Sequence, residues 1–250
     1  MPLRESEAII LQHYALGEAD WLVSFLSRTM GRVRGVASGA RKPKSRFGST
    51  LERLSHVNIW FFERANRDLV RVSQCEMIES FLSAFGDYPS SVALGIFSEV
   101  TEAALPEHEA SDANFRLLLL ASQMVKKNLK PEIPLAYFTL WTVKLGGWLP
   151  PLDRCGRCGQ LLTENESAYF STSSSTIICG RCRRSGMRVL SPAAILLERR
   201  MLSERLDRLM EGITSNLSRP ARELTNVMLD VVEQQIDRKL KSRELLEQPA

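Results

Sequence analysis

Short alternating runs of apolar and β-branched residues occupy the first third of the chain. In one such run Val57, Ile59 and Phe61 take every second position. A period of two is typical of β-strands, whose side chains alternate between two faces. The pattern predicts strands near residues 7–14, 20–28, 32–38, 56–64 and 69–76. Five strands in roughly 75 residues favour a small barrel or a sandwich.

Beyond residue 79 the apolar residues recur at intervals of three and four, which is typical of amphipathic helices. This spacing predicts helices over 92–105, 114–129, 135–145, 192 to about 210, and 220 to about 236. Ser111 and Ser191 precede two of these segments and are good N-cap residues, and Gly146 with Gly147 ends a third. The stretch 150–190 is rich in Cys, Ser and Gly and interrupts the helical pattern, so we interpret it as an insertion.

The predicted fold class is therefore α+β with several domains. We expect an N-terminal β domain over 1–80, a helical domain over 81–149 and 191–241, and a cysteine-containing insertion over 150–190. Residues 242–250 are expected to form a polar tail that frays.

Composition supports a folded protein, because 44% of the 250 residues are hydrophobic and 25% are charged. No apolar run is long enough for a membrane span or a signal peptide, and we expect a cytoplasmic protein without a membrane partner. The net charge of +4 conceals a local excess, since residues 28–53 hold eight basic residues and only one acid, Glu52.

Four of the five cysteines form two Cys-x-x-Cys pairs, Cys155 with Cys158 and Cys179 with Cys182. In a chain without an export signal this spacing favours a metal site over disulfides. Each pair supplies two thiolates from one tight turn, and four thiolates complete the tetrahedron that zinc prefers. We therefore predict a structural zinc site with no position for a reactive water. The alternative is a set of thiols that has lost its metal.

The strongest basic segment runs from residue 31 to residue 48 and combines a predicted strand with the loop that follows it. Arg32 and Arg34 are two residues apart, so they share one face of the strand. Glycine and serine in the loop would let phosphates approach the backbone. The predicted DNA-binding residues are Arg32, Arg34, Arg41, Lys42, Lys44 and Arg46. The alternative is a solvated loop.

Aromatic residues beside this segment offer a second kind of contact. Phe47, Trp60, Phe61 and Phe62 are candidates for stacking on bases, although for any single one of them a place in the core is the competing interpretation. Cys75, at the end of a predicted strand, is interpreted as a small buried residue. The sequence holds no nucleotide-hydrolysis motif and no hydrolase motif around its three histidines, so we expect no enzyme.

Taken in order, these features resemble the bacterial RecO recombination mediators. The resemblance covers nearly the whole chain and is most distinctive at 39–47 (Gly-Ala-Arg-Lys-Pro-Lys-Ser-Arg-Phe) and at 147–159, from Gly-Trp-Leu-Pro-Pro to the first cysteine pair. It implies that the N-terminal barrel is a five-stranded OB-fold, followed by helices that carry a four-cysteine zinc finger. It also implies that the basic barrel residues bind DNA and that the four paired cysteines hold zinc.

The resemblance further implies a function in DNA repair by homologous recombination. Members of this family bind single- and double-stranded DNA, anneal complementary strands and, with RecR, help RecA load onto DNA coated by single-stranded DNA-binding protein (SSB). They act in the cytoplasm, on the nucleoid. The acidic C-terminal tail of SSB, which ends in an apolar residue, would need a cation beside an apolar groove, and Arg116, Lys126 and Lys127 are the candidates here.

Two other classes of protein remain alternatives. A zinc-ribbon interaction protein of transcription or translation would share the cysteines and the basic charge, but it would not anneal DNA. A metal-dependent nuclease would need an open metal position and clustered carboxylates, which four cysteine ligands do not offer.

Overall fold

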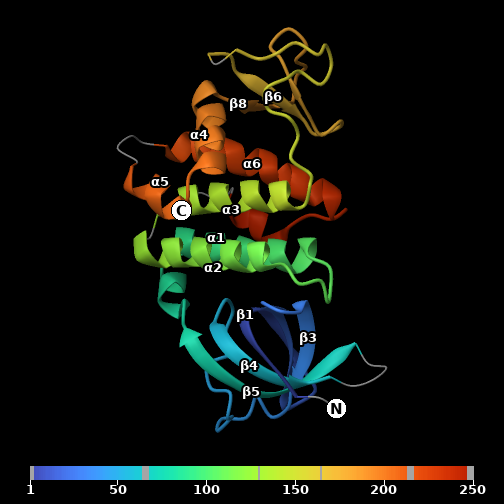
Figure 1. Cartoon of the computed structure of the whole chain (residues 1–250), viewed down its shortest axis with the longest axis vertical. Helices are drawn as coiled ribbons and strands as arrows, with labels where there is room; N and C mark the ends of the chain where they lie inside the picture. The colour runs from blue at the N-terminus through green and yellow to red at the C-terminus, as the bar shows by residue number, and fades with distance from the viewer. Residues whose placement is uncertain (1–2, 64–67, 129, 164, 213–216, 247–250) are drawn as a thin grey trace. The chain divides into compact units, whose positions relative to one another are not determined.

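The computed structural model describes residues 3–63, 68–128, 130–163, 165–212 and 217–246, and the chain divides into two compact units (Figure 1). The first unit comprises residues 1–129 together with 240–250, and the second comprises residues 130–239. The chain therefore returns to the first unit at its C-terminal end.

The first unit contains a closed five-stranded barrel. Its strands are β1 (Leu3–Leu16), β2 (Asp20–Ser27), β3 (Gly31–Ala37), β4 (His56–Phe62) and β5 (Leu69–Glu79). They follow the order β1-β2-β3-β5-β4, and β1 closes the barrel by pairing with β4. All neighbouring strands are antiparallel except β3 and β5, which are parallel. All five predicted strands are present, although residue 64, the predicted end of the fourth, lies outside the described residues. The arrangement is that of an OB-like barrel.

Alternating residues of the strands fill the barrel, as the period of two predicts. Phe25 and Phe61 lie in its core with their ring centroids 5.6 Å apart. The loop between β3 and β4 adds Phe47 and Leu51 to the same core. Phe47 and Phe61 are thus core residues. The alternative given for each of them is confirmed, and neither ring is exposed for stacking on a base.

Helices complete the first unit. They are η1 (Leu82–Gly86), α1 (Tyr88–Ala104), α2 (Asp112–Asn128) and η2 (Lys241–Leu246). Asp87 caps α1 by accepting a hydrogen bond from the backbone N–H of Ser90, and the predicted cap Ser111 accepts one from the N–H of Asn114. Residue 129, the predicted end of α2, lies outside the described residues.

The C-terminal segment differs from the expected frayed tail. Residues 241–246 form η2, which packs on α1, and Leu240 and Arg243 are buried. The carboxylate of Glu99 in α1 accepts hydrogen bonds from the backbone N–H groups of Lys241 and Ser242 and so caps this helix. The prediction of a frayed tail is wrong for 242–246, and 247–250 lie outside the described residues.

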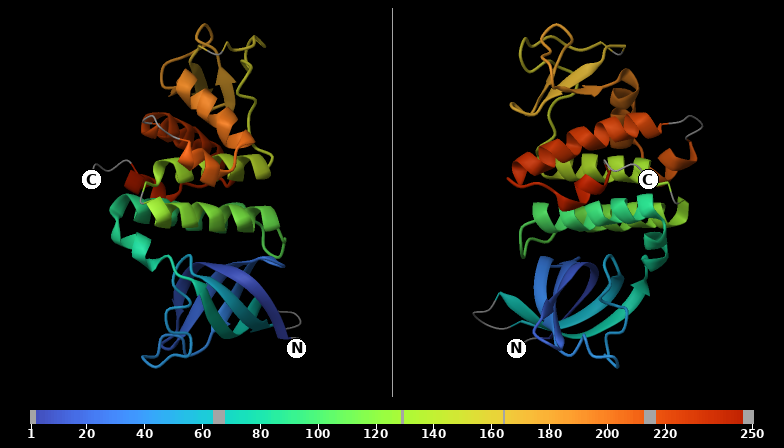
Figure 2. Two further views of the ribbon diagram at one scale, coloured as in Figure 1. Left: turned by 60° about the vertical axis from the view of Figure 1, so that its left-hand side comes forward. Right: turned by 180° about the vertical axis from the view of Figure 1, so that it is seen from behind.

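The second unit is built on α3 and α6, which lie side by side (Figure 2). Its elements are α3 (Glu132–Leu145), β6 (Ala168–Ser171), β7 (Thr176–Ile178), β8 (Arg188–Leu190), α4 (Pro192–Ser203), α5 (Leu206–Glu211) and α6 (Ser218–Gln235). The three short strands form a sheet in the order β7-β6-β8, within the predicted insertion. Ser191 caps α4 as predicted, through the N–H of Ala194.

The single helix predicted from residue 192 to about 210 is interrupted. Glu204 and Arg205 take extended backbone angles between α4 and α5. The Glu204 carboxylate turns back to accept two hydrogen bonds from Arg200, at 3.0 and 3.1 Å, and Leu206 is buried beyond the break.

Among the described residues, no helix combines the length and the apolarity that crossing a bilayer requires.

Candidate metal centre and nucleic-acid interface

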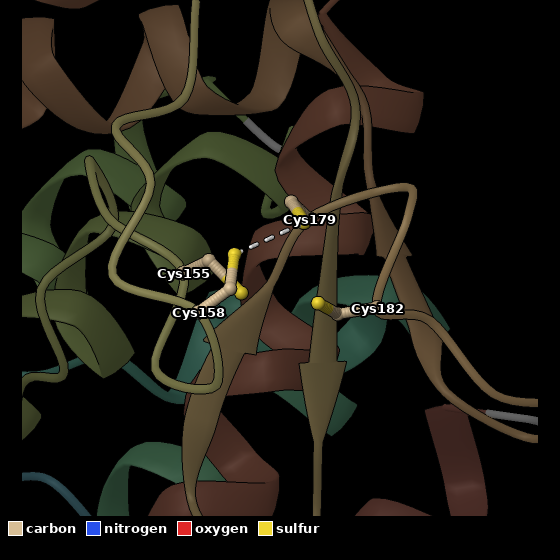
Figure 3. Close-up of side chains that lie close together, drawn as sticks. All are labelled: Cys155, Cys158, Cys179 and Cys182. Atoms are coloured by element: carbon tan, nitrogen blue, oxygen red, sulfur yellow. Dashed lines mark hydrogen bonds between the residues drawn. The ribbon is translucent and has the colours of Figure 1, made fainter.

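The four paired cysteines converge on one point in the second unit (Figure 3). Cys155 and Cys158 come from one turn, Cys179 directly follows β7, and Cys182 comes from the turn after it. Their four sulfur atoms lie within 4.8 Å of one another, and the Sγ atoms of Cys158 and Cys179 are 3.8 Å apart. The predicted spatial cluster is confirmed.

Backbone hydrogen bonds hold the two turns in place. The N–H of Cys155 donates to the carbonyl of Gln160, and the N–H of Gly156 donates to the carbonyl of Ile177, which joins the first turn to β7. A Cβ on Gly156 would lie 2.8 Å from the Cβ of Thr176, so a side chain there would separate the turn from the strand. Cys155 and Cys179 pack with Ile178 in a small apolar cluster.

The thiols of this cluster titrate differently because they are crowded. Burial opposes ionisation of Cys155, yet backbone N–H groups of Cys179, Cys158 and Arg157 lower the pKa of its thiol to about 6. Burial and the adjacent thiols of Cys158 and Cys179 raise the pKa of Cys182 to about 12. Cys155 is therefore the thiol that ionises readily, whereas Cys182 resists ionisation. Thiolates this close together repel each other, and a cation at the centre would relieve that repulsion.

The donor set fits a tetrahedral ion that prefers sulfur ligands. Four Zn–S bonds of about 2.3 Å in a tetrahedron place neighbouring sulfurs about 3.8 Å apart, which matches the separation of Cys158 and Cys179. The four cysteines could hold a metal ion.

Cys75 stands apart from them in the barrel core, where burial raises the pKa of its thiol to about 12. Its interpretation as a small buried residue is confirmed.

The two basic residues of β3 differ in how far their side chains are buried. Arg32 and Arg34 share one face of the strand, as predicted, and both donate to the same carboxylate oxygen of Glu107, each at 3.0 Å. The side chain of Arg32 is only 10% exposed, and it also donates to the carbonyl of Leu105 and to Glu102. Arg32 therefore fastens the segment after α1 to the barrel, and Arg34 is the more exposed of the two arginines.

Arg34 keeps a solvent-facing position, with 44% of its side chain exposed. Gly31, at the start of the same strand, has a φ of +71°, and a Cβ there would lie 2.0 Å from the carbonyl oxygen of Glu109. Only glycine allows the segment that carries Glu107 to come this close to β3. The close approach at Gly31 thus keeps the Glu107 carboxylate beside Arg34, where it neutralises part of the charge of Arg34.

The remaining predicted DNA-binding residues lie in the β3–β4 loop and are exposed, and two of them also contact aromatic rings. The guanidinium of Arg41 donates to the carbonyl of Gly17 and lies over the Trp21 ring, 5.4 Å from its centroid. Arg46 lies over Phe47 at 4.9 Å. Lys42 and Lys44 are exposed and form no ion pair within the described part of the chain.

Sequence reasoning missed the aromatic pair under Arg41. The rings of His13 and Trp21 have centroids 4.5 Å apart, and Trp21 packs partly against the barrel core. Trp21 pairs with Ala15, two residues from His13, so a diagonal contact across the β1–β2 hairpin was the signal available. Of the four aromatic candidates, Trp60 and Phe62 are half-buried, and they remain available for stacking.

The three candidate cations on α2 differ in their surroundings. Arg116 forms an ion pair with Asp112 at 2.9 Å, and Lys126 forms one with Glu79 at 2.9 Å while lying over the Phe81 ring. Lys127 is exposed and makes no ion pair among the described residues. The structure therefore distinguishes one free cation from two that already have partners.

The barrel, the helices and the cluster of four thiols define a multidomain α+β protein built on an OB-like barrel. A family model described as "Recombination protein O N terminal" matches residues 1–81, and one described as "Recombination protein O C terminal" matches residues 86–244. The chain belongs to the RecO family of DNA repair proteins, as the resemblance of its motifs predicted.

Individual relatives agree with this assignment. The chain is 40% identical over 183 residues to the DNA repair protein RecO of Koribacter versatilis (strain Ellin345), which covers 73% of each protein. It is 36% identical over 182 residues to that of Bifidobacterium animalis subsp. lactis (strain AD011), covering 72% of this chain and 74% of the relative. It is 33% identical over 198 residues to that of Nocardioides sp. (strain ATCC BAA-499 / JS614), covering 78% and 80%.

Proposed function

We propose that the protein is a recombination mediator that binds single- and double-stranded DNA and anneals complementary strands. In this proposal it works with RecR to help RecA load onto SSB-coated DNA, in the cytoplasm and on the nucleoid. The observation that carries the proposal is the β3–β4 loop, which presents Lys42, Lys44 and Arg46 to solvent beside an OB-like barrel. Family membership favours this function over a zinc-ribbon protein of transcription or translation.

Annealing by this surface requires no bond to be made or broken. Two strands repel each other through their phosphates, and cations that contact phosphates lower this repulsion. Contacts to the backbone carry no sequence information, so the strands can slide until their bases are in register. The exposed loop cations provide such contacts, and Trp60 and Phe62 would add sequence-tolerant stacking.

The metal in this proposal is a structural zinc ion held by Cys155, Cys158, Cys179 and Cys182. Four protein ligands leave no position for a water molecule, so the ion would cross-link the two turns of the insertion without taking part in a reaction. It would supply local folding free energy that the small apolar cluster around Ile178 cannot supply alone.

Partner binding is the part of the proposal that rests most on the family. SSB covers the same phosphates that the loop would contact, so recruitment to coated DNA needs a protein contact. We assign this contact to the SSB tail and to the α2 cations Arg116, Lys126 and Lys127, with Lys127 as the free charge.

The test is fluorescence-monitored annealing of complementary strands, naked and SSB-coated, with and without the protein. The variant carries Lys42→Gln, Lys44→Gln and Arg46→Gln, which leaves Arg41 to hold the loop. The control carries Arg205→Gln, Arg208→Gln and Arg219→Gln, which removes the same charge from exposed positions of the second unit. Loss of three phosphate contacts should reduce the salt-dependence slope of single-strand binding by about 2 logarithmic units, at roughly 0.7 per contact.

The control should keep the slope of the unchanged protein. If the unchanged protein fails to accelerate the annealing of naked strands at low salt, the proposed function is wrong. If it anneals and the loop variant keeps the full slope, DNA binds at another surface.

A further inference from the structure

The segment that holds the cysteines carries an unexplained group of arginines. We call residues 153–190 the cysteine ribbon. Its six cations are all arginine, and its acids are Asp153, Glu164 and Glu166. One of the six, Arg188, is bound to the buried carboxylate of Asp230 in α6. The other five, all exposed, are Arg154, Arg157, Arg181, Arg183 and Arg184.

The fold gathers these arginines at the thiol cluster. Both cysteine pairs have the sequence Cys-Gly-Arg-Cys, so Arg157 and Arg181 occupy the same position in the two turns. The sulfurs on either side of them lie within 4.8 Å of one another, which brings the two turns together from distant parts of the ribbon. Arg183 and Arg184 directly follow the last cysteine. Cations that are about 25 residues apart in sequence thus share one end of the ribbon.

An aromatic and apolar surface lies beside these charges. The guanidinium of Arg183 lies over the Tyr169 ring, 5.2 Å from its centroid, and donates to the Tyr169 hydroxyl at 3.0 Å. Val189 is the ladder partner of Tyr169 and is 47% exposed. An arginine spread flat on an aromatic ring keeps its outer N–H groups available for an acceptor in solution.

Balancing the thiolates does not account for all of these charges. Four thiolates around a divalent ion carry a net charge of about −2, which two cations offset. Arg181 is also held by the side chain of Gln160. Arg154, Arg157 and Arg184 remain, and within the described part of the chain they form no ion pair or side-chain hydrogen bond.

We propose that the cysteine ribbon is a second binding surface for the phosphate backbone of DNA, separate from the β3–β4 loop of the barrel. The exclusive use of arginine favours this ligand, because the planar guanidinium binds phosphate oxygens in pairs. The ribbon is a firm support for such contacts. Arg188 with Asp230, and Gln234 with the carbonyl of Thr172, fix it to α6.

This inference rests on the proposed function, and it deepens it. A protein that anneals strands must hold two polyanions at once, and one barrel surface binds one strand. A second phosphate-binding surface on the same chain would hold the other strand. We therefore expect two oligonucleotides to bind one chain.

The experiment uses the full zinc-loaded chain and two non-complementary dT15 oligonucleotides, one with a donor dye and one with an acceptor. The ribbon variant carries Arg154→Gln, Arg157→Gln and Arg184→Gln, which breaks no ion pair or side-chain hydrogen bond among the described residues. The control is Arg205→Gln, Arg208→Gln and Arg219→Gln. Zinc content verifies that the ribbon of each variant is folded.

We expect energy transfer between the two oligonucleotides on the unchanged protein and on the control. It should fall about tenfold in the ribbon variant, and the annealing rate should fall with it, while binding of a single dT15 changes less than about twofold because the barrel loop is intact. If the ribbon variant keeps full energy transfer and annealing, the inference is wrong and the proposed function stands.

Two further outcomes also decide the matter. If the ribbon variant keeps energy transfer but loses binding to a polyglutamate peptide, the surface recognises an acidic protein and the DNA assignment is overturned. If the unchanged protein binds no dT15 at low salt, the proposed function itself fails, and this inference fails with it.

Discussion

Arg34 and Glu107 form an ion pair in which the Nε atom of Arg34 lies 3.0 Å from the carboxylate oxygen that also accepts from Arg32. Glu107 therefore neutralises one solvent-facing cation of the barrel while it holds a buried one. A phosphate that binds Arg34 must compete with this carboxylate, so Glu107 sets how much Arg34 contributes to DNA binding.

Replacing Glu107 should strengthen DNA binding. In Glu107→Gln, Arg34 loses its nearer acidic partner and keeps the longer pair with Glu102 at 3.9 Å, while Arg32 keeps Glu102 and the carbonyl of Leu105. We expect about a threefold gain in single-strand affinity, since a partly exposed pair is worth at most about 1 kcal/mol, and a salt slope steeper by about 0.7. Fluorescence anisotropy over a salt series measures both. Adding Arg34→Gln should abolish the gain, and a gain that survives this addition would contradict the explanation.

Arg32 should matter for stability far more than Arg34, although the sequence presents them as equivalents. Arg32→Gln leaves Glu102 without its buried cation, and breaking a buried pair costs about 3 kcal/mol or more. Arg34→Gln should cost less than about 1 kcal/mol. Hydrogen exchange of the β3 amides measures the local opening free energy for both variants. Equal protection in the two would show that burial of Arg32 contributes nothing.

The contrast between these two arginines shows where sequence reasoning ends. Alternation and cysteine spacing are local signals, so the five strands and the thiol cluster could be predicted closely. The acids that neutralise Arg32 and Arg34 are Glu102 and Glu107, about 70 positions away and far outside the basic segment 28–53. Only the fold brings these charges together.

The same reason explains the error at the C-terminal end. Residues 242–246 contain three polar or charged side chains and two leucines with no long periodicity, so their sequence indicates a tail. Their helix depends on Glu99, more than 140 residues earlier, which caps it through the backbone of Lys241 and Ser242. The signal lies in α1 and not in the segment itself.

The cysteine cluster should bind about one equivalent of zinc per chain. Cys158→Ser removes one of four ligands, and because metal binding supplies local folding free energy, the ribbon should become sensitive to protease. The barrel should keep its unchanged hydrogen-exchange protection, since its core shares no residue with the cluster. Cys75→Ser is the control and should keep the zinc. Metal analysis that finds no zinc in protein purified without chelators would refute the site.

Glu198 in α4 should make the second unit less stable as pH rises. Burial raises the pKa of its carboxyl group, Arg199 and Lys144 oppose this effect, and Asp153 adds to it. The folded-state pKa is above the unfolded one, so the stabilising contribution is complete below the ordinary value of 4.5 and is lost as pH rises through the raised value. Glu198→Gln, which stays neutral, should therefore melt at a higher temperature than the unchanged protein at pH 7.

This advantage should shrink towards pH 4, where Glu198 is protonated in both folded and unfolded chains. Melting curves are recorded between pH 4 and pH 7.5, and at each pH the melting temperature of the unchanged protein is subtracted from that of Glu198→Gln. Titration of the cysteines affects both proteins equally and cancels in this difference. Glu211→Gln, at an exposed carboxylate, is the control and should show no trend. A constant difference at all pH values would indicate a packing effect.

Lys127 should be the α2 cation on which binding of the SSB tail depends most. An acidic tail must displace Asp112 to reach Arg116 and Glu79 to reach Lys126, whereas Lys127 has no competing ion pair among the described residues. We expect Lys127→Gln to weaken binding of a tail peptide about fivefold at low salt, since an exposed ion pair is worth at most about 1 kcal/mol. Arg116→Gln or Lys126→Gln should weaken it about twofold or less, since a cation that exchanges one acid for another gains at most about 0.4 kcal/mol. Peptide anisotropy measures this ranking, with Arg219→Gln as the control, and naked-strand annealing should be unchanged in all four variants. No binding by the unchanged protein would refute SSB docking, whereas normal binding by the three α2 variants would place the dock on another element.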